Sequence, residues 1–421
     1  MVGSGEWRGV ARHGIAAPRR WRWLAAIAWA LIIVGIVRPP AATATAGPAG
    51  MRLKAAAAVG VGLAADPPVP GPWAVGYRTV RIGDPRRPGR ELVTSLWYPA
   101  VGSGQQAGGA AGGACPEVAG GDRGRAGQPA FYPLIGEAGF DSNVAVTDAP
   151  PAPGPFPLVV FSHGSAGSRV QAAYLMEALA NDGYVVAAPD HPGDTMLDVA
   201  AGHTKEQLAM AADRSRDISA VIDALTDATC SSAPLIRPDQ IAVVGYSYGG
   251  LTAILSSIGL SPAPADPRVR VSVGIAATTA PLPRAMLAQI PVPTLLLGGG
   301  RDPIVTLGDN ADRAFTDLTA SHPRLVVAVA DATHNTFTEI CRQAGLPGTA
   351  SVPAGLRLWI ALTAATTCHP PLLPPAQAQL VADRAVVSFL DWQLRADTAS
   401  GLYLAGAGPA IGPGVTVRLQ P

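Results

Sequence analysis

The sequence predicts an α/β fold, with a mostly parallel central sheet, helices on both faces and antiparallel strands at its N-terminal side. Hydrophobic residues make up 48% of the 421 residues and charged residues 14%, which is enough apolar surface for a large buried core. Short apolar runs alternate with helix-compatible stretches, as in sheets whose strands are joined by helical crossovers. These runs are apolar throughout, which is typical of strands covered by helices on both faces.

The individual elements are expected as follows. Residues 74–82 and 91–98 are predicted to form an antiparallel pair, because a turn-rich segment separates two strand-like runs. The strands of the parallel sheet are expected at residues 157–161, 184–188, 241–244, 269–275, 294–297 and 325–329. Helices are expected at residues 169–182, 205–227, 249–258 and 376–395.

These elements predict a single domain over residues 72–399. Within it, residues 101–129 are rich in glycine and alanine and have no hydrophobic periodicity, so we expect a surface or disordered loop there. Residues 47–71 are expected to be a flexible linker and residues 400–421 a C-terminal tail.

The N-terminal segment has the three parts of a signal peptide. Five arginines fall within residues 8–22, an apolar run covers residues 23–37, and small residues that suit a signal peptidase lie at 42–46. We therefore expect residues 1–46 to direct secretion. The alternative is an uncleaved membrane anchor, but fifteen helical residues span about 22 Å of a hydrocarbon core of roughly 30 Å. Peripheral or N-terminal membrane association stays open.

Charge and cysteine usage exclude several classes of function. The net charge of +1 leaves no basic surplus for a nucleic-acid backbone, so no nucleic-acid partner is expected. The chain contains neither a CxxC nor an HExxH motif, so no metal site is predicted. In an oxidising compartment Cys341 and Cys368 could form a disulfide, with two buried thiols as the alternative. Cys115 and Cys230 are harder to pair.

The candidate nucleophile is Ser247, in the segment Gly-Tyr-Ser-Tyr-Gly-Gly at residues 245–250. The G-x-S-x-G motif is weak by itself, but here an apolar run ends directly before it and a helix-compatible stretch begins directly after it. This is the strand, sharp turn and helix of a nucleophile elbow, which projects a serine hydroxyl above a sheet. An ordinary turn serine is the alternative interpretation.

A serine hydroxyl needs a general base, and in this arrangement an acid and then a histidine follow it along the chain. Of the histidines after Ser247, His334 follows the strand 325–329 by a short loop, whereas His322 and His369 each precede a proline outside such a context. Asp302 follows the strand 294–297 and is the candidate acid that orients the imidazole. Asp331, in the same loop as His334, is the competing acid.

An oxyanion that forms during acyl transfer needs two fixed hydrogen-bond donors. We expect the backbone N–H groups of Tyr248 and Ser165, the latter in the loop after the strand 157–161. His163 lies in that loop and precedes the nucleophile, so a structural role is expected. Residues 190–194 (Asp-His-Pro-Gly-Asp) resemble a metal cluster only loosely, and hydrogen bonding within the loop is the preferred interpretation.

These residues carry a family resemblance. The segments at 161–164, 188–192, 245–250, 300–302 and 332–334 together resemble the branch of the α/β-hydrolases that contains platelet-activating factor acetylhydrolase and dienelactone hydrolase-like proteins. Residues 75–78 and 96–99 are more specific marks of that branch, and Arg216-Asp217-Ile218 in the long helix fits it. The resemblance covers about residues 72–395. The insert at 101–129 and the tail depart from it.

The resemblance implies the α/β-hydrolase fold and a serine carboxylesterase that needs no metal or other cofactor, with Ser247, Asp302 and His334 as its triad. It also implies substrates with short or oxidised acyl chains, such as platelet-activating-factor-like phospholipids and small esters. A polyester or cutinase-like hydrolase is the alternative within the enzymes. A non-catalytic binding protein of the same fold is the alternative outside them.

Overall fold

The computed structural model describes residues 71–102, 117–118, 125–135, 138–229, 235–346, 352–406 and 411–421. The predicted signal segment and nearly all of the predicted linker lie outside these residues, as do Cys115, Cys230 and most of the insert at 101–129. Among the helices of the described residues, none is both long enough and apolar enough to cross a membrane.

The strands are β1 (Ala74–Gly83), β2 (Glu91–Ala100), β3 (Glu117–Val118), β4 (Pro129–Ile135), β5 (Ala138–Thr147), β6 (Phe156–Ser162), β7 (Val185–Pro189), β8 (Ile236–Tyr246), β9 (Val269–Ile275), β10 (Thr294–Gly299), β11 (Arg324–Val329) and β12 (Val415–Gln420). The helices are α2 (Ala173–Asn181), α3 (Met196–Ala201), α4 (Gln207–Thr226), α5 (Tyr248–Ile258), α6 (Arg284–Leu287), α7 (Arg313–Asp317), α8 (Ile340–Ala344), α9 (Ala354–Ala365), α10 (Pro375–Leu394) and α11 (Thr398–Gly406). Two single turns complete the series, the π-helical η2 (Gly308–Asp312) and the 3₁₀-helical η3 (His334–Phe337).

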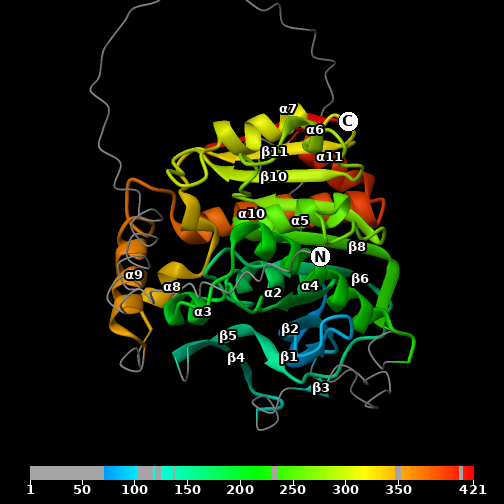
Figure 1. The fold of residues 1–421 in the computed structure, drawn as a ribbon, viewed down its shortest axis with the longest axis vertical. Coiled ribbons are helices and arrows are strands. Elements are labelled where there is room, and N and C mark those ends of the chain that lie inside the picture. The colour runs from blue at the N-terminus through cyan, green and yellow to red at the C-terminus, as the bar shows by residue number, and fades with distance from the viewer. Residues whose placement is uncertain are drawn as a thin grey trace, which may run out of the picture.

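All of these strands join one twisted sheet in the order β12-β11-β10-β9-β8-β6-β7-β2-β1-β5-β4, with β3 paired to β1 (Figure 1). The six strands from β11 to β7 are mutually parallel. Each strand expected from an apolar run is present, within a few residues of its expected limits, except that β8 is longer. The prediction of a mostly parallel sheet is therefore confirmed.

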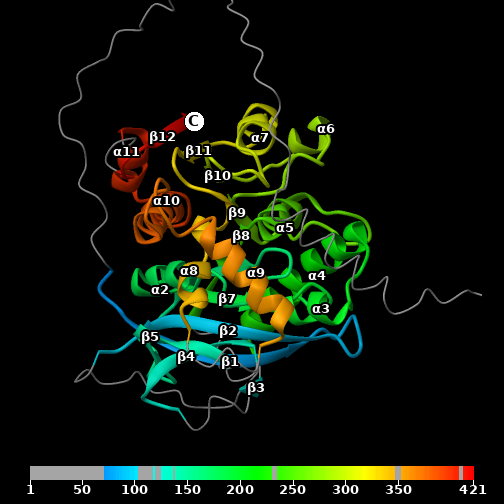
Figure 2. The same ribbon diagram turned by 90° about the vertical axis from the view of Figure 1, so that its left-hand side faces the viewer.

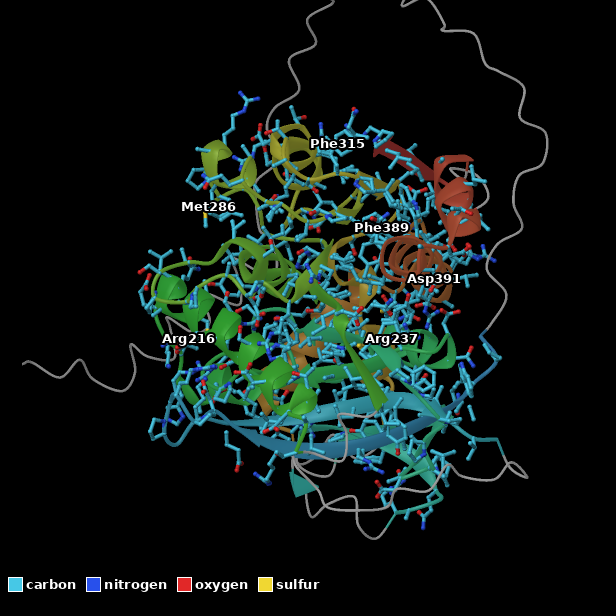
Figure 3. The ribbon with its side chains drawn as sticks, turned by 90° about the vertical axis from the view of Figure 1, so that its right-hand side faces the viewer. Arg216, Arg237, Met286, Phe315, Phe389 and Asp391 are labelled. Carbon is cyan, nitrogen blue, oxygen red and sulfur yellow. A yellow bond between two sulfur atoms is a disulfide. The ribbon has the colours of Figure 1, made fainter. Side chains whose placement is uncertain are left out.

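Helices cover both faces of the sheet, as the apolar runs predict. Figure 2 shows α2, α10 and α11 on one side of the sheet and α4, α5, α6 and α7 on the other. Alternate residues of one strand serve the two layers: Val159 packs with the α2 and α10 side, and Leu158 packs with the α4 side. Side chains fill both layers, among them Phe389 of α10, which is completely buried (Figure 3).

The antiparallel N-terminal pair is also present. β1 and β2 pair along their whole length, from Ala74 opposite Ala100 to Gly83 opposite Glu91. β2 joins the parallel part of the sheet by pairing antiparallel with β7. Beyond β1, the sheet continues into β5 and β4, two strands that the sequence patterns did not predict.

The C-terminal segment differs from the predicted tail. Residues 400–421 include most of α11 and all of β12, and β12 pairs antiparallel with β11 from Arg324 opposite Gln420 to Val329 opposite Val415. The segment is thus the edge of the sheet and part of the domain. It is held there because β11 would otherwise leave a row of backbone hydrogen-bonding groups unpaired.

The loops that matter for function all leave the carboxyl ends of the parallel strands. Residues 163–167 follow β6, Ser247 follows β8, Asp302 follows β10 and His334 follows β11. In an open parallel sheet this edge is where ligands bind. Helices α8 and α9 lie at the same end of the sheet, the end toward which the arrowhead of β10 points (Figure 1).

Candidate active site

Ser247 lies at the sharp turn between β8 and α5. Strand β8 ends at Tyr246 and helix α5 begins at Tyr248, so a single residue makes the turn, with φ 55° and ψ −117°. A non-glycine residue in this region carries strain of about 1–3 kcal/mol and persists only where its surroundings impose it. Here the Ser247 N–H donates to the Ile275 carbonyl on β9 at 2.8 Å. The strand–serine–helix arrangement is the one that the motif predicts.

Two glycines allow the elbow to pack so tightly. A Cβ atom at Gly245 would lie 2.0 Å from the Gly249 carbonyl oxygen, and one at Gly249 would lie 1.9 Å from the Ser162 carbonyl oxygen. Both distances are far inside van der Waals contact with backbone atoms, which cannot rotate away. The glycines are therefore needed because strand, turn and helix approach one another closely, which is the reason for their places in the motif.

The structure brings Ser247, His334 and Asp302 together. His334 Nε2 is 2.9 Å from Ser247 Oγ, and His334 Nδ1 is 2.7 Å from Asp302 Oδ2. If Nδ1–H donates to the carboxylate, Nε2 is left as the acceptor for the serine hydroxyl, which is the tautomer that a general base requires. The Asp302 side chain is completely buried and that of His334 is 8% exposed.

The loop after β10 holds Asp302 in place. Its second carboxylate oxygen, Oδ1, accepts the backbone N–H groups of Ile304 and Val305, each at 2.8 Å. The carboxylate is thus fixed by its own loop on one oxygen and faces His334 with the other. Because β10 and β11 are adjacent and parallel, the loops that follow them meet at the same edge of the sheet.

The competing residues lie elsewhere. Asp331 pairs with Arg301 at 2.8 Å, and both side chains are about half exposed. The ring of His322 is 2.9 Å from the Pro421 carbonyl oxygen through Nδ1, and His369 is exposed. None of these three has a contact with Ser247 among the interactions of the described residues.

The two predicted oxyanion donors lie in the turn after β8 and in the loop after β6. Tyr248 is the first residue of α5, so its N–H is one of the groups at a helix N-terminus that lack an intrahelical acceptor. Ser165 is exposed in the loop that follows β6. The Gly164 N–H of that loop donates to Gln171 Oε1 at 2.8 Å, which fixes the backbone directly before Ser165.

His163 and the segment 190–194 form a buried hydrogen-bond network behind this loop. The His191 N–H donates to His163 Nε2 at 3.0 Å, and His191 Nδ1 lies 2.9 Å from Asp217 Oδ2. Burial, together with the neighbouring Arg214, lowers the pKa of His191 to about 4, so its imidazole is neutral at pH 7. Within the described part of the chain, no group of His, Cys, Asp and Glu side chains has the arrangement of a metal site.

Sequence reasoning did not single out Arg214 and Asp217 of α4 as part of this network. Both side chains are completely buried, and Asp217 accepts bonds from Arg90 at 2.6 and 2.7 Å. Burial by itself raises the pKa of Asp217, but the bonds from Arg90 and His191 outweigh it and hold that pKa below its usual range. A signal was present, because Arg214 lies four residues before Ile218, on the face of the helix that packs against the sheet.

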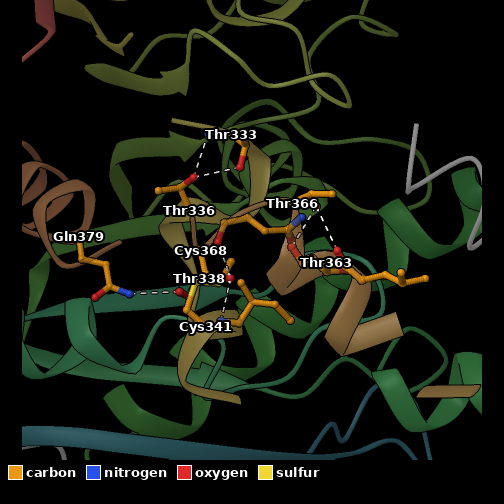
Figure 4. Close-up of a disulfide and its surroundings, with 11 residues drawn as sticks. Thr333, Thr336, Thr338, Cys341, Thr363, Thr366, Cys368 and Gln379 are labelled. Atoms are coloured by element: carbon orange, nitrogen blue, oxygen red, sulfur yellow. Dashed lines mark hydrogen bonds between the residues drawn. A yellow bond between two sulfur atoms is a disulfide. The ribbon is translucent and has the colours of Figure 1, made fainter. Parts of the chain in front are cut away.

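A disulfide joins the two helices that follow the His334 loop. Cys341 of α8 is bonded to Cys368, three residues after the end of α9, with their Cα atoms 5.7 Å apart (Figure 4). The alternative of two buried thiols does not describe this structure. The Thr338 carbonyl, between His334 and Cys341, accepts from Gln379 Nε2 of α10 at 3.1 Å. The bond and this contact attach the segment to the domain next to the site.

Removing the disulfide is expected to destabilise the protein. The bond closes a loop between residues 27 apart, and the chain-entropy model assigns such a loop about 3–4 kcal/mol. The double variant Cys341→Ser/Cys368→Ser should therefore lose roughly that free energy of unfolding in urea titrations. Wild-type protein unfolded in the presence of a reductant is the matched comparison, and equal midpoints with and without reductant would contradict the expectation.

A second expectation concerns the buried carboxyl of Glu339, directly before α8. Burial raises its pKa from 4.5 to about 7, although Oε1 accepts the Tyr174 N–H. Because the folded pKa is above the unfolded one, this group stabilises the fold fully below pH 4.5. That contribution is lost as the pH rises to 7. Glu339→Gln keeps a side-chain oxygen that can accept the Tyr174 N–H, but it cannot ionise. Between pH 5 and pH 8 the free energy of unfolding of this variant should therefore fall by about 2–3 kcal/mol less than that of the wild type.

The measurement is the free energy of unfolding of both proteins at the two pH values. Glu91→Gln, at an exposed ion pair with Arg81, is the control and should follow the wild type. A Glu339→Gln variant with the same pH dependence as the wild type would show that the carboxyl does not titrate in this range.

A serine at a strand–helix turn, with an acid and a histidine after later strands of a parallel sheet, defines the α/β-hydrolase class, and this chain has that fold. The dienelactone hydrolase family model matches residues 144–345, a range that contains Ser247, Asp302 and His334. Together with the relatives below, it supports the dienelactone hydrolase-like branch of the α/β-hydrolases, in agreement with the resemblance in the sequence.

Three known proteins illustrate the similarity. A cutinase of Thermobifida alba is 27% identical over 42% of this chain and 52% of its own length. A platelet-activating factor acetylhydrolase of Canis lupus familiaris is 24% identical over 44% of this chain and 48% of its own length. The chain thus spans about half the length of these curated relatives. The structure of a ferulic acid esterase from Streptomyces cinnamoneus superposes with a TM-score of 0.58 at 25% identity, over 85% of this chain and 100% of that one.

Proposed function

We propose that this protein is a serine ester hydrolase that acts through an acyl-enzyme on Ser247. The observation that carries the proposal is the continuous chain of contacts from Ser247 Oγ to His334 at 2.9 Å and from His334 to Asp302 at 2.7 Å. This is the geometry in which a base can take the serine proton while a carboxylate orients the base. The names of the three relatives, each an esterase, cutinase or acetylhydrolase, support the same class of reaction.

The mechanism follows from the positions of the residues. His334 Nε2 accepts the hydroxyl proton as Ser247 Oγ attacks the ester carbonyl carbon, and Asp302 stabilises the imidazolium that forms. The N–H groups of Tyr248 and Ser165 are proposed to bind the oxyanion. His334 then gives the proton to the departing alcohol. Water, activated by the same histidine, attacks the acyl-enzyme and releases the acid and the free serine.

For the substrate we propose esters with short acyl chains, including phospholipid-type molecules such as platelet-activating factor. The resemblance in sequence and the acetylhydrolase relative support this class. The similarity to a cutinase favours polyester hydrolysis as the second candidate. We further propose that the protein is secreted, on the pattern of residues 1–46, which lie outside the described residues.

Initial rates on a series of p-nitrophenyl esters from acetyl to palmitoyl test the proposal. A steep preference for acetyl and butyryl esters is the expected result. A flat profile, or a preference for long chains, would reject the short-chain class in favour of a lipase or polyesterase. No turnover of any ester would overturn ester hydrolysis itself and favour a non-catalytic binding protein.

A further inference from the structure

A completely buried guanidinium lies between the two segments that carry the predicted oxyanion donors. On one side, Arg214 Nη1 donates to the His163 carbonyl at 2.6 Å and Nη2 donates to the Gly164 carbonyl at 3.2 Å. These two carbonyls directly precede Ser165. On the other side, the Arg214 guanidinium carbon lies 5.2 Å from the centre of the Tyr248 ring. One side chain from α4 therefore contacts both segments that carry the proposed oxyanion donors.

Asp194 extends the contact to Ser165 itself. Its Oδ2 is 2.8 Å from Arg214 Nη2, so the two form a buried ion pair. Its Oδ1 accepts the Ser165 hydroxyl at 2.7 Å and the Ala166 N–H at 3.3 Å. Arg214 thus holds the loop at the carbonyl groups of residues 163 and 164. Asp194 holds it at the hydroxyl of Ser165 and at the N–H of residue 166.

Burying a cation costs free energy, so packing alone does not explain why an arginine lies here. Moving an ion out of water costs several kcal/mol even when it is paired. A neutral side chain could fill the volume, but it could not bind two carbonyls and a carboxylate while lying against an aromatic face. Planar donors of fixed geometry suit the task of fixing a loop backbone.

We propose that Arg214 is a positioning residue that fixes both donors of the oxyanion site at once. It fixes the Ser165 N–H through its contacts with His163, Gly164 and Asp194. It fixes the Tyr248 N–H through its contact with the aromatic ring of that residue. The inference rests on the proposed function, because it assigns a role in stabilising the oxyanion of that reaction. It predicts that Arg214 acts on the transition state more than on the bound substrate, since the oxyanion exists only there.

Arg214→Gln tests the role, with p-nitrophenyl butyrate as the substrate and a trifluoromethyl ketone, whose adduct with Ser247 carries an oxyanion, as the probe. Losing one oxyanion donor typically costs 10²–10³ in kcat, so we expect kcat to fall about 10²-fold with KM changed less than about threefold. Affinity for the trifluoromethyl ketone should fall about as much as kcat. Arg214→Lys keeps the charge and should recover part of the loss.

Arg395→Gln is a matched control at the other end of the parallel strands, where Arg395 contacts the residues directly before β7. Arg395 also pairs with carboxylates, Asp182 and Asp391 at 2.8 Å, donates to the Gly183 carbonyl at 2.7 Å, and lies over a tyrosine ring, that of Tyr184, at 4.1 Å. Its loss should lower the melting temperature but leave kcat and the affinity for the ketone unchanged. An equal fall in kcat for both variants would reduce the role of Arg214 to general stability.

Asp194→Ala provides the second test, should Arg214→Gln fail to fold. It cuts the connection that runs from Arg214 through Asp194 to the Ser165 hydroxyl and keeps the two carbonyl contacts, so a fall in kcat of about tenfold with little change in KM is expected. Wild-type kcat in this variant would overturn the connection. The proposed function is judged separately, by whether Ser247→Ala abolishes the wild-type activity. Where it does, wild-type kcat in Arg214→Gln would overturn the positioning role alone.

Discussion

Replacing Ser247 with alanine is expected to lower kcat for p-nitrophenyl esters by about 10⁶-fold, because the substitution removes the only atom that forms the acyl bond. The oxyanion donors and the substrate contacts remain, so the residual rate should still exceed that of the buffer. The melting temperature should hardly change, since the alanine removes only one hydroxyl, which His334 contacts. Rates of the purified variant and its thermal unfolding are the measurements.

Ser256→Ala is a suitable control for this experiment. Ser256 lies on the same helix, α5, and its buried hydroxyl donates to the Thr252 carbonyl at 2.8 Å. That variant should keep the wild-type kcat. A Ser247→Ala protein with more than about one hundredth of the wild-type rate would place the nucleophile elsewhere, since such a loss is far too small for this role.

The second large effect is expected for Gly249→Ala. The new Cβ would lie 1.9 Å from the Ser162 carbonyl oxygen and 2.5 Å from its carbonyl carbon, so α5 and β6 would have to separate. Such overpacking costs about 3 kcal/mol or more of unfolding free energy. It would also displace the loop that carries Ser165, because Ser162 is the last residue of β6. We therefore expect a lower urea midpoint together with a loss of activity of at least about 10²-fold.

Gly355→Ala is the matched comparison. Gly355 lies on α9, and a Cβ there would meet no atom within 4 Å. The same change should leave stability unaltered or raise it by up to about 1 kcal/mol, the helix propensity difference. If Gly249→Ala were as stable and as active as Gly355→Ala, the close approach at the elbow would not be a constraint in solution.

The sheet could be predicted because its strands are buried on both faces. A strand such as β6, in which every residue is buried, is apolar up to its last residue and stands out from its neighbours. Similar apolar runs placed Ser247, which directly follows β8, and Asp302 and His334, which follow β10 and β11 by short loops, because parallel strands bring their carboxyl ends to one edge. The positions in the sequence were therefore enough to predict that the three side chains would meet.

Elements with weaker hydrophobic patterns were missed for physical reasons. β12 is an edge strand in which only Val415 is buried, and it is stabilised mainly by pairing with β11, which is distant in sequence. Helix α9 leaves Leu358 and Leu362 largely exposed, so its pattern does not distinguish a packed face. Arg214 was missed because a charged residue is assigned to the solvent face of a helix unless its buried partners are known.

Covalent labelling tests the central claim, a nucleophilic Ser247 activated by His334, most directly. The protein is treated with a fluorophosphonate, its intact mass is measured, and the modified peptide is sequenced. We predict one adduct per chain, located on Ser247, with labelling strongly slowed in His334→Ala and absent in Ser247→Ala. An unlabelled wild-type protein, or an adduct that persists in the Ser247→Ala variant, would contradict the account.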